Sequence, residues 1–240
     1  MKARYDEIYH DIRRNIEAGT YVYQSFLPSE AVLTGMYACS HSTVRRAIAV
    51  LRDNGYVQPV HGKGVRVTYR EPERESFSVG GIESFDEARR RSGFSSTTRV
   101  VAFEHMQATQ AIADQTGFAP GDELFAIERI RIIDGEALIL DRNFFLASAA
   151  EGLTPQIAEA SIYNYLENTL GITIAMSKRE ITGERATDRD RELLDLDDVD
   201  YLAVVKSQTF DAQGTMIEYT QSRHRLDHFC FRSTAVRQGV

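Results

Sequence analysis

The chain has 240 residues, of which 42% are hydrophobic and 10% aromatic, as in globular proteins long enough for two domains. Since no apolar run approaches the roughly 20 residues that cross a bilayer, and the N-terminus is charged and amphipathic, we expect neither a membrane segment nor a signal peptide. Cys39 and Cys230 offer no disulfide framework or metal-ligand spacing. We therefore expect a cytoplasmic protein without a bound metal.

The net charge of −7 is unevenly distributed along the chain. Residues 1–70 contain 10 lysines and arginines against 6 aspartates and glutamates, a net of +4, whereas the remainder contains 18 against 29, a net of −11. Such asymmetry is typical of a small DNA-binding module joined to an acidic domain. The charged, proline-bearing stretch around Pro72 predicts a boundary, which gives a DNA-binding domain at 1–70, a linker at 71–76 and a second domain at 77–240.

Three helices are predicted in the first domain. Apolar positions between Tyr5 and Ile16 trace one helical face, and Ser29 is placed to cap a second helix, with Leu33, Met36 and Tyr37 facing inward. The third helix begins after Ser40, and Gly55 occupies the position that favours a left-handed residue. Its apolar face follows the i, i+3, i+4, i+7 spacing, with Val44, Ala47, Ile48 and Leu51.

The second and third helices are separated only by Ala38 and Cys39, which indicates a helix-turn-helix. Two strand-like segments then enclose the glycine turn 61–64, so a winged helix-turn-helix is predicted. A solvated basic surface is the alternative interpretation of the polar face of the third helix. In a DNA-binding protein, these polar residues contact double-stranded operator DNA. The predicted contacts are Ser29, His41, Ser42, Thr43, Arg45, Arg46, His61, Gly62 and Lys63.

Four runs in this region resemble the winged-helix domain of GntR-family transcription regulators: Leu-Pro-Ser-Glu at 27–30, Ser-Thr-Val-Arg-Arg-Ala at 42–47, Gly-Tyr at 55–56 and Gly-Lys-Gly at 62–64. The resemblance implies a DNA-binding regulator. Ala31 stands where the family usually has a polar residue, and His41 where it usually has Arg. Because His cannot make the bidentate contact with guanine that Arg makes, we expect Arg45 to contribute more of the recognition of DNA bases.

The remainder predicts an α+β domain with a mostly antiparallel sheet. The expected strands are 97–107, 123–133, 136–145, 172–185, 201–211 and 216–222, and the expected helices are 84–92, 109–116, 161–170 and 188–194. Asp134-Gly135 indicates a tight hairpin between two of the strands. The region resembles the effector-binding domain of the HutC-type branch of the GntR family, whose fold is shared with chorismate lyase.

Arg129 and Arg131 alternate on one predicted strand, so both side chains leave the same face, where a phosphate suits two guanidiniums. Ser161 caps a helix that could complete the phosphate site. The alternative is an exposed pair bridged to neighbouring carboxylates. The resemblance implies a further set of effector-binding residues, in which carboxylates accept hydrogen bonds from ligand hydroxyls. The full set is Ser84, Arg129, Arg131, Asp141, Ser161, Tyr163, Glu218, Arg223 and His224.

Runs at 161–167, 190–196 and 218–227 are most similar to family members that respond to trehalose, which implies trehalose 6-phosphate as effector. An amino-sugar phosphate or a carboxylate remains an alternative. No nucleophile elbow, phosphate-binding loop or zinc motif is present, so we expect neither an enzyme nor a cofactor. A lyase-like enzyme domain is the remaining alternative. Two operator half-sites about one helical turn apart would require a homodimer.

Overall fold

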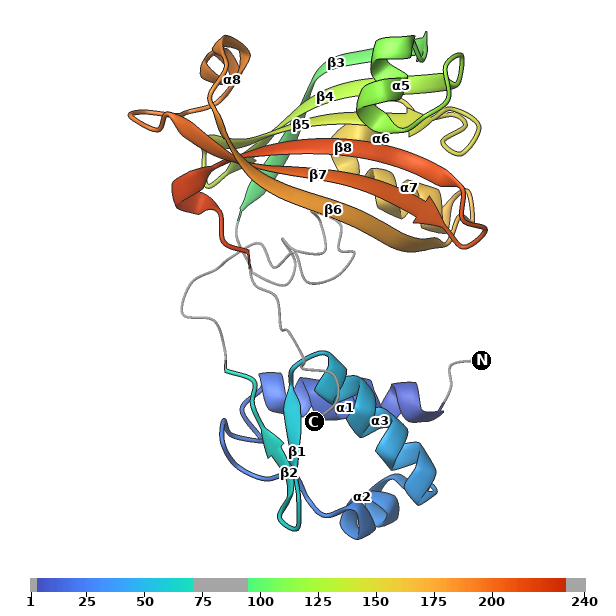
Figure 1. Ribbon diagram of the computed structural model, residues 1–240, viewed down its shortest axis with the longest axis vertical. Helices are drawn as coiled ribbons and strands as arrows, with labels where there is room; N and C mark the ends of the chain where they lie inside the picture. Colours follow the sequence, from blue (N-terminus) through green and yellow to red (C-terminus); the bar gives the residue numbers. More distant parts are fainter. Residues whose placement is uncertain (1–3, 71–94, 232–240) are drawn as a thin grey trace. The chain divides into compact units, whose positions relative to one another are not determined.

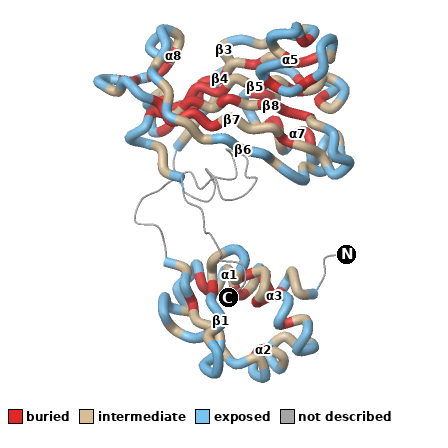
Figure 2. Tube along the Cα trace, in the orientation of Figure 1, coloured by how far each residue is buried: buried red, intermediate tan, exposed pale blue. Residues whose placement is uncertain are grey.

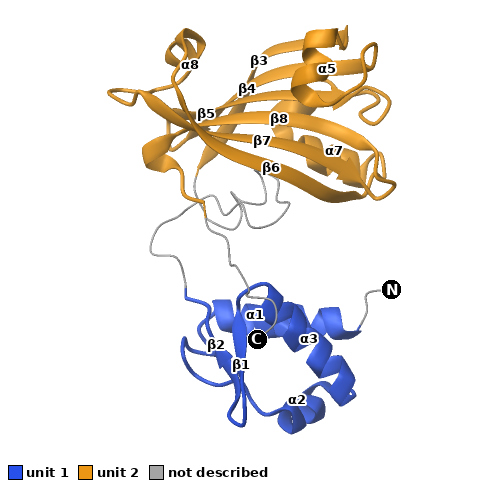
Figure 3. Ribbon diagram, viewed as in Figure 1, with its two compact units in different colours: residues 1–75, 233–240 blue, residues 76–232 orange. Residues whose placement is uncertain are grey.

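The computed structural model describes residues 4–70 and 95–231, which form two compact units (Figure 3). The predicted linker 71–76, the predicted helix 84–92 and Ser84 lie outside the described residues. Each unit has its own hydrophobic core, as the length and composition led us to expect.

The first unit contains the three predicted helices, α1 (Arg4–Glu17), α2 (Glu30–Tyr37) and α3 (His41–Asp53), shown in Figure 1. The Ser29 hydroxyl accepts a hydrogen bond from the Val32 amide, and the Ser40 hydroxyl accepts one from Thr43, so both predicted N-caps are present. Gly55 has φ +77°, the left-handed conformation expected beyond α3. The buried apolar face of α3 consists of Val44, Ala47, Ile48 and Leu51.

A hairpin of β1 (Val57–Val60) and β2 (Gly64–Val67) follows α3 and completes the predicted winged helix. The loop before α2 pairs with β2, because the Leu27 amide donates to the Val65 carbonyl over 2.8 Å and the Val67 amide to the Ser25 carbonyl over 2.8 Å. The hairpin is therefore fixed to the helices. The inward orientation predicted for Met36 is wrong: this residue is 59% exposed, because the core-facing side of the short α2 is formed by Leu33, which is buried, and Tyr37, which packs against the core.

The second unit is built on a six-stranded sheet in the order β3-β4-β5-β8-β7-β6, and all of these neighbouring pairs are antiparallel. Asp134 and Gly135 both have positive φ, as a two-residue type I′ hairpin between β4 and β5 requires. The strands are β3 (Ser96–Gln107), β4 (Glu123–Ile133), β5 (Glu136–Leu146), β6 (Ile174–Arg185), β7 (Tyr201–Asp211) and β8 (Met216–Arg225).

Helices pack against both faces of the sheet. On one face, α6 (Pro155–Ala160) and α7 (Ile162–Asn168) bury Ala158 and Leu166 against Phe145 of β5. On the other, α5 (Gln110–Thr116) packs at one end of the strands and α8 (Asp188–Leu193) at the opposite end. Buried positions concentrate in the four central strands, as Figure 2 shows, while β3 and β6 form the edges. A short 3₁₀ helix (Leu226–His228) follows β8.

Two features of this unit differ from the sequence predictions. Helix α6 was not expected, because six residues are too short to display an apolar period, although Thr154 caps it and Pro155 begins it. Strand β8 continues to Arg225, three residues beyond the predicted end at 222. The extension brings Arg223 and His224 into the sheet, where adjacent residues point to opposite faces.

Candidate functional sites

The N-terminal end of α3 carries several exposed polar side chains on a rigid framework. His41, Ser42, Arg45 and Arg46 are exposed and Thr43 is half-buried. The hydroxyl of Ser40 lies 2.8 Å from the hydroxyls of both Ser42 and Thr43, so the cap also orders two predicted DNA-contacting groups. This end of the helix can present hydroxyls and guanidiniums to a nucleic acid.

Arg45 and Arg46 of α3 both have partners on other helices. The Nε of Arg45 donates to the two carboxylate oxygens of Glu30 over 3.2 and 2.9 Å. The guanidinium of Arg46 lies 4.0 Å from the ring centroid of Tyr5, in cation–π geometry. Elsewhere on this unit, the exposed residues at the tip of the wing and the exposed N-cap of α2 complete the predicted DNA-contacting set, with His61, Gly62, Lys63 and Ser29.

The sheet face beneath α6 and α7 carries a band of interconnected polar side chains. Strand register places Thr98 of β3 opposite Arg131 of β4, and places Arg129 of β4, Asp141 of β5 and Ser222 of β8 opposite one another. Arg131 is opposite Ile139 and reaches Asp141 diagonally. Further hydrogen bonds join Arg129 to Asn143, and Asn143 to Thr220 and Glu218. Most of these groups are buried, so the band is a polar site inside a hydrophobic unit.

The two predicted arginines lie side by side in this band. Arg131 donates from Nε to Asp141 over 2.9 Å and from a terminal nitrogen to the Thr98 hydroxyl over 2.6 Å. Arg129 donates to Asn143 over 2.8 and 3.1 Å and to the Ala158 carbonyl over 3.1 Å. The pair is thus buried and not exposed, while both arginines form ion pairs with Asp141, a bridging that the alternative interpretation expected.

The pKa values around the pair follow from burial and mutual charge. Burial, followed by the charge of Arg131, lowers the pKa of Arg129 to about 9. Burial alone would raise the pKa of Asp141, but Arg131, Arg129 and a 2.6 Å hydrogen bond from Ser222 together hold it below its usual value. Both shifts have the sign that a locally positive potential produces.

A second acidic centre lies on the same face at Glu218. Its carboxylate accepts hydrogen bonds from the hydroxyls of Tyr163 and Thr220, each over 2.6 Å, and from Asn143 over 3.2 Å. The Tyr163 hydroxyl also lies 3.2 Å from that of Thr209 on β7. Burial and the neighbouring Glu218 charge raise the pKa of Tyr163 well above its usual value, so this phenol stays protonated.

Two further predicted residues border the band. Ser161 caps α7, and its hydroxyl accepts a hydrogen bond from the Asn164 amide over 3.3 Å. His224 lies on the same face of β8 as Ser222 and is half-buried. Burial lowers the pKa of His224 to about 4; the charge of Arg131 contributes and that of Asp141 opposes. The imidazole is therefore neutral near pH 7.

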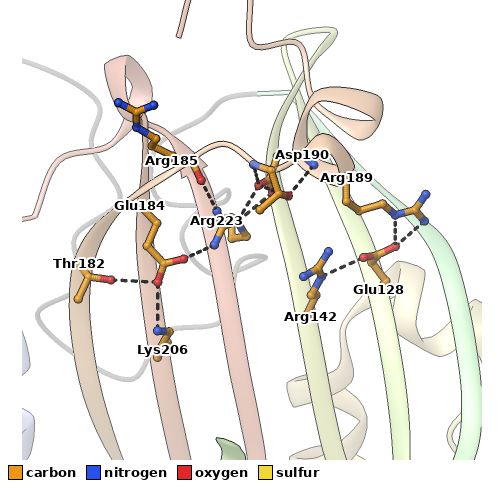
Figure 4. Close-up of polar contacts among 10 residues, drawn as sticks. Glu128, Arg142, Thr182, Glu184, Arg185, Arg189, Asp190, Lys206 and Arg223 are labelled. Carbon is orange, nitrogen blue, oxygen red and sulfur yellow. Dashed lines mark hydrogen bonds and ion pairs between the residues drawn. The ribbon is translucent and has the colours of Figure 1, made fainter. Parts of the chain in front are cut away.

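Arg223 is not brought together with the other predicted effector residues. It points to the opposite face of β8, as Figure 4 shows, where its Nε binds both oxygens of the fully buried Asp190 over 2.9 and 3.1 Å. A terminal nitrogen binds Glu184 over 2.6 Å, and another donates to the Arg185 carbonyl. Because Asp190 also forms the capping box of α8 with Thr187, Arg223 fastens α8 to the sheet.

Sequence reasoning missed five polar members of the band, because Ser, Thr and Asn occur so widely that none attracts attention alone. Their common signal is position: each sits across from, or two residues from, a charged residue on a neighbouring strand. These residues are Thr98, Asn143, Thr209, Thr220 and Ser222.

Comparisons with known proteins agree with this architecture. Residues 4–67 match the model for bacterial regulatory proteins of the gntR family, and residues 91–230 match the UTRA domain. The HTH-type transcriptional regulator TreR of Bacillus subtilis is 40% identical over 230 residues, which cover 96% of each chain. This chain belongs to the GntR family of bacterial transcription regulators.

Other relatives extend the same picture. The mannosyl-D-glycerate transport/metabolism system repressor MngR of Escherichia coli is 25% identical over 99% of this regulator and 98% of its own length. The structure of the Bacillus subtilis TreR effector binding domain matches with 39% identity and a TM-score of 0.55, covering 60% of this chain and 99% of that domain. The crystal structure of YydK from Bacillus subtilis matches with a TM-score of 0.81, 20% identity, and coverage of 98% of this chain and 100% of that chain.

Membership of this family identifies the chain as a DNA-binding transcription regulator with a C-terminal UTRA effector-binding domain, and not as an enzyme. It confirms the predicted fold class, a winged helix-turn-helix domain followed by a mostly antiparallel α+β domain. Within residues 4–70 and 95–231, no helix is long and apolar enough to cross a membrane.

Proposed function

We propose that this regulator is a cytoplasmic homodimeric repressor whose affinity for operator DNA is controlled by a sugar phosphate, trehalose 6-phosphate being the first candidate. The observation that carries the ligand class is the buried pair Arg129 and Arg131, on one sheet face beside Asp141. Two guanidiniums in a dry site favour a dianionic phosphate, to which arginine forms charge-assisted bidentate bonds. The relative that is 40% identical is TreR of Bacillus subtilis, and the solved effector binding domain of that protein is described as part of the trehalose repressor. This similarity supports trehalose as the sugar.

The rest of the band suits the sugar. A polyol can form hydrogen bonds with the carboxyl group of Glu218, the hydroxyls of Thr209 and Thr220, and the side-chain amide of Asn143. Tyr163 brings a protonated phenol from α7. We propose that the phosphate lies against the arginines and the sugar against the Glu218 end, with Ser84, Ser161 and His224 completing the site.

Operator reading is assigned to the exposed end of α3 and to the wing. Arg45 and His41 are proposed to contact base edges, with Arg46 at the same end of the helix. The hydroxyls of Ser29, Ser42 and Thr43, together with the wing residues His61, Gly62 and Lys63, are proposed to contact phosphates or the minor groove. An effector that binds one conformation more tightly changes the operator affinity by its differential affinity for the two.

The first experiment is calorimetric titration with trehalose 6-phosphate, trehalose and glucose 6-phosphate. We expect binding of the first only. Arg129→Gln and Arg131→Gln should each weaken it roughly 10- to 100-fold, because each removes a charged hydrogen bond. Arg142→Ala is the matched control, since Arg142 lies on β5 but faces the other side of the sheet, where it binds Glu128 over 3.0 Å. Thermal unfolding of each variant verifies that it is folded.

Three results would contradict the proposal. Binding of an amino-sugar phosphate or a carboxylate alone would replace the ligand but keep the arginine site. Equal losses of sugar-phosphate affinity in Arg129→Gln and Arg142→Ala would show that the phosphate does not bind on this face of the sheet. An operator affinity that is unchanged at saturating sugar phosphate would contradict effector control itself.

A further inference from the structure

Arg45 is held along one edge by a carboxylate from the preceding helix. Glu30, the first residue of α2, accepts from the Arg45 Nε with both of its oxygens, over 3.2 and 2.9 Å. The Arg45 side chain is nevertheless 70% exposed. Its two terminal nitrogens form no hydrogen bond to any residue within 4–70 or 95–231, so the outer edge of the guanidinium faces solvent.

This arrangement leaves the outer edge of the Arg45 guanidinium available to contact a DNA base. Bidentate recognition of guanine uses two N–H groups of one arginine, and the two terminal nitrogens of Arg45 provide them. An arginine that swings freely must lose rotamer freedom on binding, which weakens affinity by roughly two- to tenfold for one long side chain. A carboxylate that already fixes the Nε edge removes part of that loss.

The same carboxylate lies next to the other predicted base reader. His41 Nδ1 is 3.7 Å from the Glu30 oxygen that accepts the shorter Arg45 bond. Glu30 thus stands between two side chains of α3 while belonging to α2. Exposed ion pairs contribute little to stability, so holding α2 against α3 is a weak explanation for this contact. A negative charge here also opposes DNA phosphates, which lowers affinity for all sequences alike.

We propose that Glu30 is a specificity-determining positioning residue: it orients Arg45 for one base pair of the operator and weakens binding to non-operator DNA. The inference rests on the proposed role of α3 as the reading helix. Both effects increase the preference for the operator over other DNA. The orientation of Arg45 strengthens its contact with the correct base pair, and the repulsion between Glu30 and phosphates weakens binding to all sequences. Glu30 itself contacts no base in this scheme.

The test uses the full chain and duplexes that the wild-type protein selects from a random-sequence pool. Arg45→Ala first locates the base pair that Arg45 reads, where discrimination between bases is lost. Glu30→Ala should then reduce discrimination at that same base pair by roughly two- to tenfold and raise affinity for unselected DNA. Glu30→Gln, which retains an amide oxygen as acceptor, should restore part of the discrimination, a result that loss of charge alone would not give.

Asp53→Ala is the matched control. Asp53 forms a comparable pair with Arg52 at the far end of α3, over 2.9 and 2.7 Å. Its removal should raise affinity for all duplexes without altering discrimination, and the thermal unfolding midpoints of all variants should stay close to wild type.

The outcomes distinguish the role of Glu30 from that of α3. Full discrimination in Glu30→Ala, with discrimination lost in Arg45→Ala, overturns the role of Glu30 and leaves the proposed reading helix intact. Uniform weakening by Arg45→Ala across all duplexes makes Arg45 a phosphate contact and overturns the inference as well. Unchanged binding by Arg45→Ala overturns the proposed function of α3 itself.

Discussion

In residues 4–70, Arg45 and Arg46 lie exposed at the start of α3, whereas in residues 95–231 Arg129, Arg131 and Arg223 are buried in the sheet. Among the described residues, every buried charged side chain belongs to the second unit. Exposed cations suit a long polyanion, because each phosphate contact adds a small, salt-sensitive increment. Buried cations suit one small anion, because they are costly without a partner and strong with one. The two units thus place the same residue type in environments that suit different partners.

The largest effect is expected where a buried charge loses its partner. Asp190→Ala leaves Glu184 as the one carboxylate that pairs with Arg223 among the described residues and removes the capping box of α8, so we expect the second unit to lose about 3–5 kcal/mol of stability. Hydrogen exchange resolved by peptide measures each unit separately. The control Glu192→Ala removes an exposed partner of Arg189 on the same helix and should cost less than about 1 kcal/mol. Equal losses of stability in Asp190→Ala and Glu192→Ala would contradict the expectation that a buried charge pair matters more than an exposed one.

Acid should destabilise the second unit through His224. Its pKa is about 4 in the folded protein, mainly because of burial, against 6.5 when unfolded. Between these values the unfolded chain binds more protons, so stability is full above pH 6.5 and decreases as the pH falls toward 4. We expect about 2 kcal/mol to be lost by pH 5.

Urea unfolding over a pH series measures this slope. His224→Asn should flatten it in the second unit. His41→Asn, in an exposed position of the first unit, should leave the slope unchanged. A wild-type slope in His224→Asn would assign the acid sensitivity to another group.

A smaller effect is expected from the N-cap of α3. Ser40→Ala removes the side-chain acceptor of the Thr43 amide and the contacts to two hydroxyls, which should cost the first unit about 1 kcal/mol. Chemical unfolding followed by hydrogen exchange measures the loss. Ser42→Ala, which keeps the cap, should cost less than half as much. Destabilisation of the second unit by Ser40→Ala would show that the two cores are not independent.

The smallest change is expected at the wing. Lys63→Ala should weaken binding to all operator sequences alike and reduce the slope of log affinity against log salt by about one per subunit. Filter binding at several salt concentrations measures this slope. Lys178→Ala, an exposed lysine of the second unit, should leave it unchanged. A sequence-selective loss in Lys63→Ala would instead assign this residue to base reading.

Much of the first unit could be predicted, because its signals are local. Caps at Ser29 and Ser40, a left-handed glycine at Gly55 and an apolar period on α3 each act within one or two turns. In the second unit, the bounds of β4 and β7 were predicted to the residue. The prediction that Met36 faces inward was wrong, because an eight-residue helix contains too few turns for an apolar periodicity to define its buried face.

The candidate site could be predicted only in part, because its contacts depend on strand register. Arg129 and Arg131 were found from alternation alone, yet the partner of Arg129 is Asn143, which is apparent only once β4 and β5 are paired. Arg223 and His224 were predicted together as wall residues of the effector pocket, and the predicted strand ended at 222. In a strand that continues to 225, the two residues necessarily face opposite sides.

Strand β8 therefore carries two separate sets of residues in alternation. From Glu218 onward its even-numbered positions face the polar band, with Glu218, Thr220, Ser222 and His224, while Arg223 and Arg225 anchor the other face. For the construction of biosensors, this interleaving defines a mutational library. Randomising Glu218, Thr220, Ser222 and His224 alone would vary the proposed ligand site and leave the Arg223–Asp190 attachment of α8 in place, whereas a contiguous library over the same stretch would also remove that attachment.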